Sequence, residues 1–471
     1  MTVAPRDALA ALWSSAGLPA TALGNAALSG AEPVLPSSFA VGTASQVSLA
    51  AAALAAAELG RLRNGLGQEV AVDMREAALE SCGYFTVDGR APVVWDRVAG
   101  LYPCGVDGNG GWVRLHTNFA HHRDGVLTLL GLPPGPGTER TSVAAALARW
   151  TALDFEAAAT DAGLVVAALR SHDDWRRHPQ SQAIARLPLV EIRRIGEAPP
   201  LPWPMLAASS RPLEGLRVLD LTRILAGPIA GRTLAAYGAD VMLVNSPHLP
   251  NIDAIADTSR GKRSALADLR SDAGIAALRS VLAEAHVFLQ GYRPGGLAAL
   301  GFSVDDVVRC RPGIVHATLS AYGRLGPWSA RRGFDSLVQT ATGFNVDEAH
   351  AAAASAPKAL PLQVLDMAAG FLTAFGITAA LGRQRLEGGS WHVEVSLART
   401  GQWLRELGRV DGGFMVSAAS ALDFAAQLET SASGFGALVA LRHAARLSRT
   451  PAGYARPSVR PGTDPLSWSA P

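Results

Sequence analysis

The stretch that decides the fold is residues 216–245, which read LRVLDLTRILAGPIAGRTLAAYGADVMLVN. Its first six residues form a short apolar run typical of a strand. Gly227-Pro228 suits the first turn of a helix, and Gly238 suits the end of that helix. A second apolar run, Asp240–Asn245, follows at once. Strand, helix and strand with short joints predict a βαβ unit with parallel strands and a right-handed crossover.

The same alternation continues downstream of this unit. Further strands are predicted at 264–269, 286–292, 313–320 and 391–397, and further helices at 273–285, 304–310, 334–343 and 367–386. Strands that alternate with helices in this way are typical of a sheet covered on both faces. The fold class predicted for residues 206–410 is therefore α/β, with an open, doubly wound, mostly parallel sheet.

The rest of the chain follows other patterns. Residues 86–205 alternate a short strand (112–116) with a helix (142–158) and end in the proline-rich stretch 199–204, which predicts a small α+β domain and a linker. Residues 411–471 predict a weakly helical segment (418–447) and an irregular tail.

The N-terminal segment contains an echo of the last third of the predicted sheet domain. When Val41 is aligned with Val364, the same offset aligns Val72 with Val395 and places Thr43 opposite Asp366. Both stretches read as a long helix of small residues, a glycine turn and a strand. Residues 1–85 are therefore interpreted as a partial repeat, although alanine-rich helices can also match by chance.

Composition excludes several function classes. The formal charge is +2, from 42 basic and 40 acidic residues, and no basic block favours nucleic acid. The three cysteines form no CxxC pair, which favours a reducing compartment over a disulfide scaffold. The apolar stretch Val47–Leu59 is too short to span a bilayer, and the N-terminus lacks a signal pattern. We expect a soluble cytoplasmic protein with no membrane partner.

Several common catalytic signatures are missing from the sequence. The first strand-to-helix turn, residues 221–228, is not GxGxxG, so it does not favour a dinucleotide. No Walker lysine motif, GxSxG elbow or HExxH pair occurs. The sequence therefore lacks the usual signatures of redox enzymes, nucleotide hydrolases, serine hydrolases and zinc proteases.

Asp366 is the strongest candidate for a catalytic residue. It stands at the start of the predicted helix 367–386, near the carboxyl edge of the sheet, where α/β sites lie. One interpretation is an N-cap whose carboxylate accepts backbone N–H groups. The other is a nucleophile that attacks a thioester carbonyl and is kept ionised by the positive end of the helix.

Other polar residues follow predicted strands. Lys262 and Arg263 form a basic pair that could hold phosphates or could be an ordinary surface pair. Arg223 and Arg293 each follow a strand, and Tyr292 could lie against an adenine ring or pack at the rim. The cluster His116, His121 and His122 lacks known metal-ligand spacing, so we expect solvated or substrate-adjacent histidines rather than a metal site.

Several motifs, in the order in which they occur along the chain, resemble those of family III CoA transferases, the group that contains formyl-CoA and carnitine-CoA transferases. The resemblance is carried by residues 212–228, Tyr237-Gly-Ala-Asp-Val241, Gly261-Lys-Arg-Ser264, Gly291-Tyr-Arg-Pro-Gly295, Gly326-Pro327, Gly333-Phe-Asp335, and Asp366 with the helix that follows it. It implies a Rossmann-like CoA-transferase domain, a homodimer, no metal, and coenzyme A as a co-substrate.

The resemblance also implies roles for individual residues. Asp366 falls on the catalytic aspartate, which takes the acyl group from an acyl-CoA and then carries CoA to a carboxylic acid. Residues that would line the CoA site are Leu225, Ala226, Lys262, Gly291, Tyr292, Leu300 and Arg332, to which the pattern adds Arg223, Arg263 and Arg293.

The chain also departs from the family pattern. A segment like the small domain precedes the sheet domain here, which is typical of a rearranged or fused gene. Related racemases place a histidine where Phe334 stands, which argues against proton chemistry at the α-carbon because that chemistry needs a base on each face. The alternatives are a catalytically silent CoA-binding or scaffold protein and an acyl-CoA racemase or isomerase.

Overall fold

A seven-stranded sheet forms the centre of the molecule, for which the computed structural model describes residues 2–468. Six strands are parallel, and β7 pairs antiparallel with β13 at one edge. In spatial order the strands are β10 (Lys262–Leu266), β9 (Asp240–Asn245), β8 (Arg217–Leu221), β11 (Val287–Gln290), β12 (Val315–Ser320), β13 (Ser390–Ser396) and β7 (Glu191–Gly196). The predicted mixed α/β architecture with a mostly parallel sheet is confirmed.

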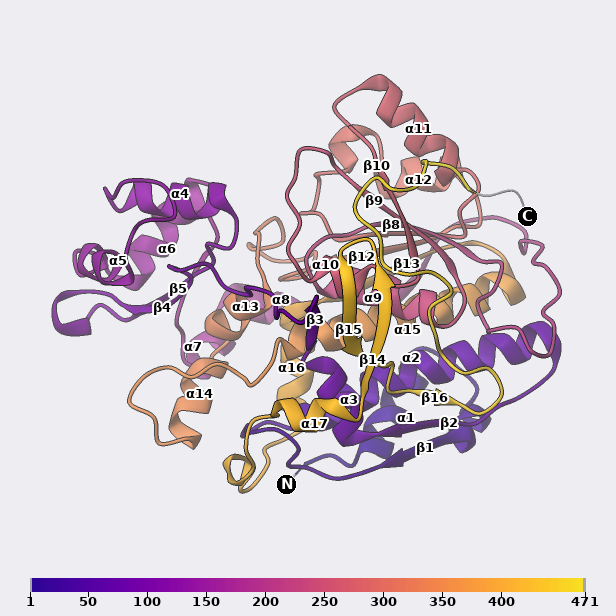
Figure 1. Ribbon diagram of the computed structural model, residues 1–471, viewed down its shortest axis with the longest axis horizontal. Coiled ribbons are helices and arrows are strands. Elements are labelled where there is room, and N and C mark those ends of the chain that lie inside the picture. The colour runs from indigo at the N-terminus through magenta and orange to yellow at the C-terminus, as the bar shows by residue number, and fades with distance from the viewer. Residues whose placement is uncertain (1, 469–471) are drawn as a thin grey trace.

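Helices pack against both faces of this sheet (Figure 1). One face is covered by α9 (Ala226–Ala236) and α15 (Val364–Glu387), and the other by α11 (Asp272–Leu282) and α12 (Val304–Cys310). Neighbouring strand residues divide between the two cores, since Val218 packs with α9 and Leu219 with α11. The inner strands β8, β9 and β11 are mostly apolar because helices cover both of their faces.

Helix α15 lies at the centre of the larger core. It is long and apolar enough to cross a membrane, yet it is enclosed by protein along its length. At 24 residues it is longer than the apolar stretch Val47–Leu59, on which the expectation of no membrane-spanning segment was based. Gly370 explains the use of small residues, because a Cβ there would lie 2.7 Å from the carbonyl oxygen of Ala226 in α9.

A smaller unit projects from the sheet domain on the left of Figure 1. It consists of the antiparallel strands β4 (Gly100–Pro103), β5 (Trp112–Leu115) and β6 (Val166–Ala168) with α4 (Ala120–Leu129), α5 (Arg140–Leu147) and α6 (Ala152–Asp161). The single helix expected at 142–158 is wrong. The chain breaks after α5, and the Thr151 side chain accepts a hydrogen bond from Asp154 N (3.2 Å) to begin α6.

Two short helices lead from this unit back to the large sheet, and four more lie in the sheet domain. They are α7 (His172–Arg177) and α8 (Pro179–Ile184), which lead back to β7, and α10 (Ile255–Thr258), α13 (Asp335–Ala341), α14 (Phe344–Ala351) and α16 (Leu397–Glu406) in the sheet domain. Strand β7 belongs to the large sheet although it falls within the segment predicted as the small domain. Residues 199–204 link β7 to β8 without regular structure.

The two ends of the chain pack together beside α15. The N-terminal segment forms α1 (Pro5–Ser15), β1 (Ala26–Ser29), α2 (Val41–Asn64), β2 (Val70–Asp73), α3 (Met74–Ser81) and β3 (Phe85–Val87). The C-terminal segment forms α17 (Ala421–Ala425), β14 (Leu428–Ser433), β15 (Gly436–Leu441) and β16 (Arg446–Leu447). The helix expected at 418–447 is wrong, because Gly434 and Gly436 turn the chain into a hairpin that pairs with β3.

Candidate active site

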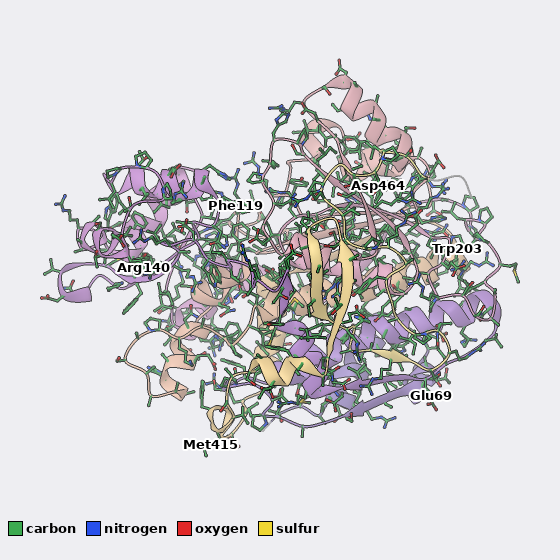
Figure 2. All side chains as sticks on the ribbon, in the orientation of Figure 1. Glu69, Phe119, Arg140, Trp203, Met415 and Asp464 are labelled. Carbon is green, nitrogen blue, oxygen red and sulfur yellow. The ribbon has the colours of Figure 1, made fainter. Side chains whose placement is uncertain are left out.

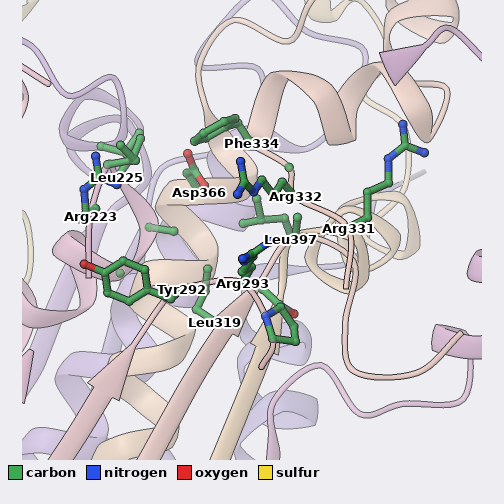
Figure 3. Close-up of a pocket in the computed structure, with 18 of the residues that line it drawn as sticks. Arg223, Leu225, Tyr292, Arg293, Leu319, Arg331, Arg332, Phe334, Asp366 and Leu397 are labelled. Atoms are coloured by element: carbon green, nitrogen blue, oxygen red, sulfur yellow. The ribbon is translucent and has the colours of Figure 1, made fainter. Parts of the chain in front are cut away.

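A cavity of about 360 Å³ lies at the carboxyl ends of β8, β11 and β12 (Figure 3). Strands β8 and β11 are neighbours in the sheet, although β9 and β10 separate them in the chain. At such a switch point the connections leave in opposite directions and open a crevice. The cavity is lined by residues 223–227, 291–294, 319–321 and 331–334, by Asp366 and Leu397, and by Phe119, His121, His122 and Leu249.

The turn after β8 forms one wall of the cavity. Ile224 has a φ of 76°, a left-handed conformation that is costly for a β-branched residue. Gly227 permits the turn, because a Cβ there would lie 2.5 Å from the Thr222 side chain. Helix α9 then begins at Ala226 without a side-chain cap. Its first N–H groups therefore face the cavity at the positive end of the helix.

Asp366 lies on the cavity wall as the third residue of α15. The N-cap is Gln363, and no side chain caps the helix. The interpretation of Asp366 as an N-cap is therefore wrong. Its side chain is largely buried but borders the open space, close to Phe334 and Arg332 in Figure 3.

A second buried carboxylate, Asp335 at the start of α13, holds the beginning of α15. Asp335 Oδ2 accepts a hydrogen bond from Asp366 N (2.9 Å), and its Oδ1 accepts one from Gln339 Nε2 (2.5 Å). Gln339 Oε1 in turn accepts a hydrogen bond from Leu360 N (3.0 Å). In the sequence, Asp335 is part of a family motif but carries no predicted role. This network fixes the segment that carries Asp366.

The two carboxyl groups disfavour each other's ionisation. Burial raises the pKa of Asp366 well above its ordinary value, and the charge of Asp335 raises it further. Burial likewise raises the pKa of Asp335 to about 6, against the lowering effect of its hydrogen bonds and of Arg114. The expectation that the positive end of the helix keeps Asp366 ionised is therefore wrong. Burial and the charge of Asp335 raise its pKa by more than the helix end can lower it.

Three arginines of the cavity lack a carboxylate partner. Within residues 2–468, no carboxylate oxygen lies within 4.0 Å of the guanidinium groups of Arg223, Arg293 or Arg332. The Arg223 guanidinium lies 5.5 Å from the Phe119 ring centroid. Burial and the nearby Arg293 lower the pKa of Arg332. Arg331, by contrast, turns away in Figure 3 and pairs with Glu156 (2.9 Å). The cavity thus has an excess of positive charge.

Eight of the predicted site residues line this one cavity: Arg223, Leu225, Ala226, Gly291, Tyr292, Arg293, Arg332 and Asp366. The other three, Lys262, Arg263 and Leu300, do not. Leu300 packs against the core between the sheet and α11.

The prediction that Lys262 and Arg263 line the CoA site is wrong. Strand β10 begins at Lys262, earlier than expected, so both residues lie inside the sheet rather than in a loop. Lys262 Nζ is buried and bonds to Asp220 Oδ2 (2.9 Å) and to the carbonyl oxygen of Pro228 (2.9 Å). Arg263 Nε pairs with Asp240 (2.8 Å) at another surface. Neither side chain borders the cavity.

The small unit contributes the opposite wall of the cavity. Phe119 lies at the junction of this unit with the sheet domain (Figure 2), and His121 and His122 line the cavity beside it. Burial and nearby positive charges lower the pKa of His122 to about 4, so it is neutral at pH 7. The His116 ring stacks on the Phe334 ring, with 3.8 Å between the ring centroids. Within residues 2–468, no cluster of three metal-ligating side chains occurs.

Comparisons with known proteins identify relatives of the sheet domain. Residues 213–407 match the family model for CoA-transferase family III. An acyl-CoA transferase of Gibberella moniliformis is 30% identical over 328 residues, which cover 65% of this chain and 56% of the fungal protein. A succinate–glutarate CoA-transferase of Agrobacterium fabrum is 31% identical over 209 residues, which cover 40% of this chain and 51% of that protein.

A crystal structure of Rv3272 from Mycobacterium tuberculosis matches with a TM-score of 0.39 and 32% identity, over 42% of this chain and 56% of that one. The chain spans about half the length of these relatives. The family match covers the elements β8 to α16, which carry Asp366 and most of the cavity. Residues 213–407 of the chain are therefore similar to CoA-transferase family III.

Proposed function

We propose that the chain transfers CoA from an acyl-CoA thioester to a carboxylic acid, and that residues 206–410 act as a doubly wound, Rossmann-like CoA-transferase domain. One observation carries the proposal: the Asp366 carboxyl group borders a cavity that also holds three arginines without carboxylate partners. The family of residues 213–407 supports the same reaction class.

The proposed reaction uses Asp366 as a nucleophile. Its carboxylate attacks the thioester carbonyl, which gives an aspartyl anhydride and releases the CoA thiolate. The thiolate attacks the aspartyl carbonyl, which gives aspartyl-CoA and frees the donor acid. The acceptor carboxylate then attacks the aspartyl-CoA carbonyl, which forms a second anhydride and again releases the CoA thiolate. The thiolate attacks the acceptor's carbonyl in this anhydride, which gives the new acyl-CoA and releases the Asp366 carboxylate. A carboxylate with a raised pKa is a stronger nucleophile once it is ionised.

The residues of the cavity fit CoA as a co-substrate. Arg223, Arg293 and Arg332 supply positive charge for phosphates, and the free N–H groups at the start of α9 can accept an anion. Tyr292 offers a ring to the adenine. Leu225, Ala226 and Gly291 line the same wall. The proposed partners are therefore an acyl-CoA and a carboxylic acid, without a metal, and a cytoplasmic location remains a prediction.

The test is the Asp366→Asn variant. It keeps the shape of the side chain but cannot form the anhydride, so turnover should fall by several orders of magnitude while CoA binding by calorimetry persists. Asp411→Asn, on the exposed surface, is the matched control. Hydroxylamine added with mixed acyl-CoA thioesters should convert Asp366 of the wild type to a hydroxamate, which peptide mass spectrometry locates. Full activity of the Asn variant would refute the mechanism, and CoA binding without any hydroxamate would favour the silent binding protein.

A second candidate function is proton exchange at the α-carbon of an acyl-CoA. The presence of neutral His122 on the same cavity as Asp366 favours it, because that chemistry needs two bases. Phe334 stands where the related racemases have a histidine, which ranks this candidate second. Deuterium uptake from solvent into the α-position of recovered acyl-CoA, lost in His122→Phe, would establish it.

A further inference from the structure

The N-terminal segment repeats a unit of the sheet domain in three dimensions. Helices α2 and α15 are both 24 residues long, so one offset that aligns Val41 with Val364 also aligns their last residues. Helices α3 and α16 begin with the same offset, at Met74 and Leu397. The residues before the two long helices share an unusual backbone conformation, with φ −76° and ψ 61° at Ala40 and φ −81° and ψ 61° at Gln363. Chance matching of alanine-rich sequence does not produce these equalities.

The strands around each helix are repeated as well. In the large sheet, β13 has the parallel neighbour β12 on one side and the antiparallel neighbour β7 on the other. In the small sheet, β2 has the parallel neighbour β1 and the antiparallel neighbour β16. The antiparallel neighbours also reach an equivalent position, since Glu191 of β7 faces Glu394 and Arg446 of β16 faces Ala71, which is the equivalent of Glu394. The C-terminal strand β16 therefore completes the first copy.

The two copies pack on each other through equivalent positions. Helices α2 and α15 lie side by side and form the most extensive contact between elements (Figure 1). A Cβ at Gly382 of α15 would lie 3.8 Å from Leu62 Cδ1 and 4.0 Å from Leu59 Cδ1 of α2, and Gly382 and Leu59 are equivalent under the same offset. Contact between equivalent positions is the mark of a twofold interface. The pair α2–α15 thus has the geometry of a dimer interface within one chain.

The first copy lacks a working site. Thr43 replaces Asp366, although Glu32 Oε1 accepts a hydrogen bond from Thr43 N (2.7 Å) much as Asp335 does from Asp366 N. The space beside the helix start is filled, because a Cβ at Gly42 would lie 2.4 Å from Val34. Between residues 2 and 85, no strands correspond to β8 and β11, whose ends form the other wall of the cavity.

We infer that this chain contains its own partner: the N-terminal repeat covers the face of α15 that a second copy would otherwise cover. The active unit is then a single chain with one site. This inference replaces the homodimer expected from the family resemblance. It concerns assembly and does not depend on the proposed reaction.

Native mass spectrometry and thermal unfolding of the full chain test the inference. A single-chain mass is expected at all concentrations, with a Tm that is constant over a hundredfold range of protein concentration. Melting of a dimer depends on concentration by mass action. A dimer mass, or a Tm that rises with concentration by several degrees, would overturn the inference.

A variant of the internal interface sharpens the test. Leu59→Ala should lower the Tm by the same amount at every concentration and leave the mass at one chain, while Leu66→Ala, on an exposed residue, serves as the matched control. A Leu59→Ala protein whose mass halves would show an interface between chains and overturn the inference. Asp366→Asn should behave as the wild type in both measurements, so failure of the proposed function would leave this result unaffected.

Discussion

Replacing Lys262 with methionine separates a structural role from a ligand-binding role. The ammonium group is buried, donates to Asp220 Oδ2 and Pro228 O at 2.9 Å each, and does not border the cavity that Asp366 lines. Methionine keeps most of the length of the side chain and removes the charge. Burial lowers the pKa of Lys262, while the attraction of Asp220 opposes this effect. The variant therefore leaves Asp220 as an uncompensated charge in the core.

The expected loss of stability is large. Removing one partner of a buried ion pair costs about 3–5 kcal/mol, against a total of about 5–15 kcal/mol for a typical domain. For a domain of roughly 200 residues this corresponds to a fall in Tm of roughly 6–20 °C. Asp220 Oδ1 still accepts from Thr222 N (3.0 Å) and Thr222 Oγ1 (2.5 Å), which moderates the loss.

Calorimetry and urea unfolding measure the effect, and steady-state kinetics below the Tm measure the KM for acyl-CoA. The Asp220→Asn, Lys262→Met double variant should recover part of the loss, because neither charge then stays buried alone. Arg270→Met, at an exposed pair, should change stability by less than about 1 kcal/mol. An unchanged Tm together with a raised KM would refute this reasoning and restore Lys262 as a phosphate ligand.

Three further predictions concern the cavity and the core. In the proposed mechanism Asp366 attacks as a carboxylate, so activity should fall as the pH drops through its raised pKa. Asp335→Asn removes the like charge and should move the acidic limb of the kcat/KM profile to lower pH. Arg223→Gln and Arg332→Gln should each raise the KM for acyl-CoA by about ten- to a hundredfold, with kcat little changed, as initial rates would show. Arg232→Met removes the buried cation that Glu80 and Asp257 share, although Glu80 keeps His443 and Asp257 keeps Arg260, and it should lower the free energy of unfolding in urea by about 3 kcal/mol without a change in KM.

Most of the sheet domain could be predicted because its inner strands and its longer helices have local signals. Asp240–Asn245 and Val304–Cys310 are placed without error, since an apolar run or an amphipathic turn ends at a glycine, serine or proline signal. The hairpin at 428–441 was missed because its alternating small residues resemble a weak helix. It pairs with β3 from the opposite end of the chain, and no local pattern shows a contact between segments so far apart in sequence.

The candidate site was predictable where topology alone places a residue. Arg223 and Arg293 follow parallel strands, and the carboxyl ends of parallel strands share one edge of the sheet. The prediction for Lys262 was wrong because β10 begins before its predicted start, so the side chain lies in the core and not in a loop. His122 could not be assigned from sequence, because its place on the cavity depends on how the small unit packs against the sheet domain.

The internal repeat is weak in the sequence and clear in the structure, and helix packing explains the difference. A helix that packs closely on its own equivalent needs small residues along the contact, and many combinations of alanine, glycine, serine and threonine satisfy that need. Identities between α2 and α15 are therefore few, while their lengths and starting conformations agree. The proposed nucleophile, in contrast, has no substitute, so Thr43 in place of Asp366 and the filled space beside it would remove the proposed chemistry from the first copy and leave the packing intact. The first copy thus stabilises the second by packing against it. We expect substitutions at Asp366 to change activity directly and substitutions at Thr43 to change it only by changing the stability of the fold.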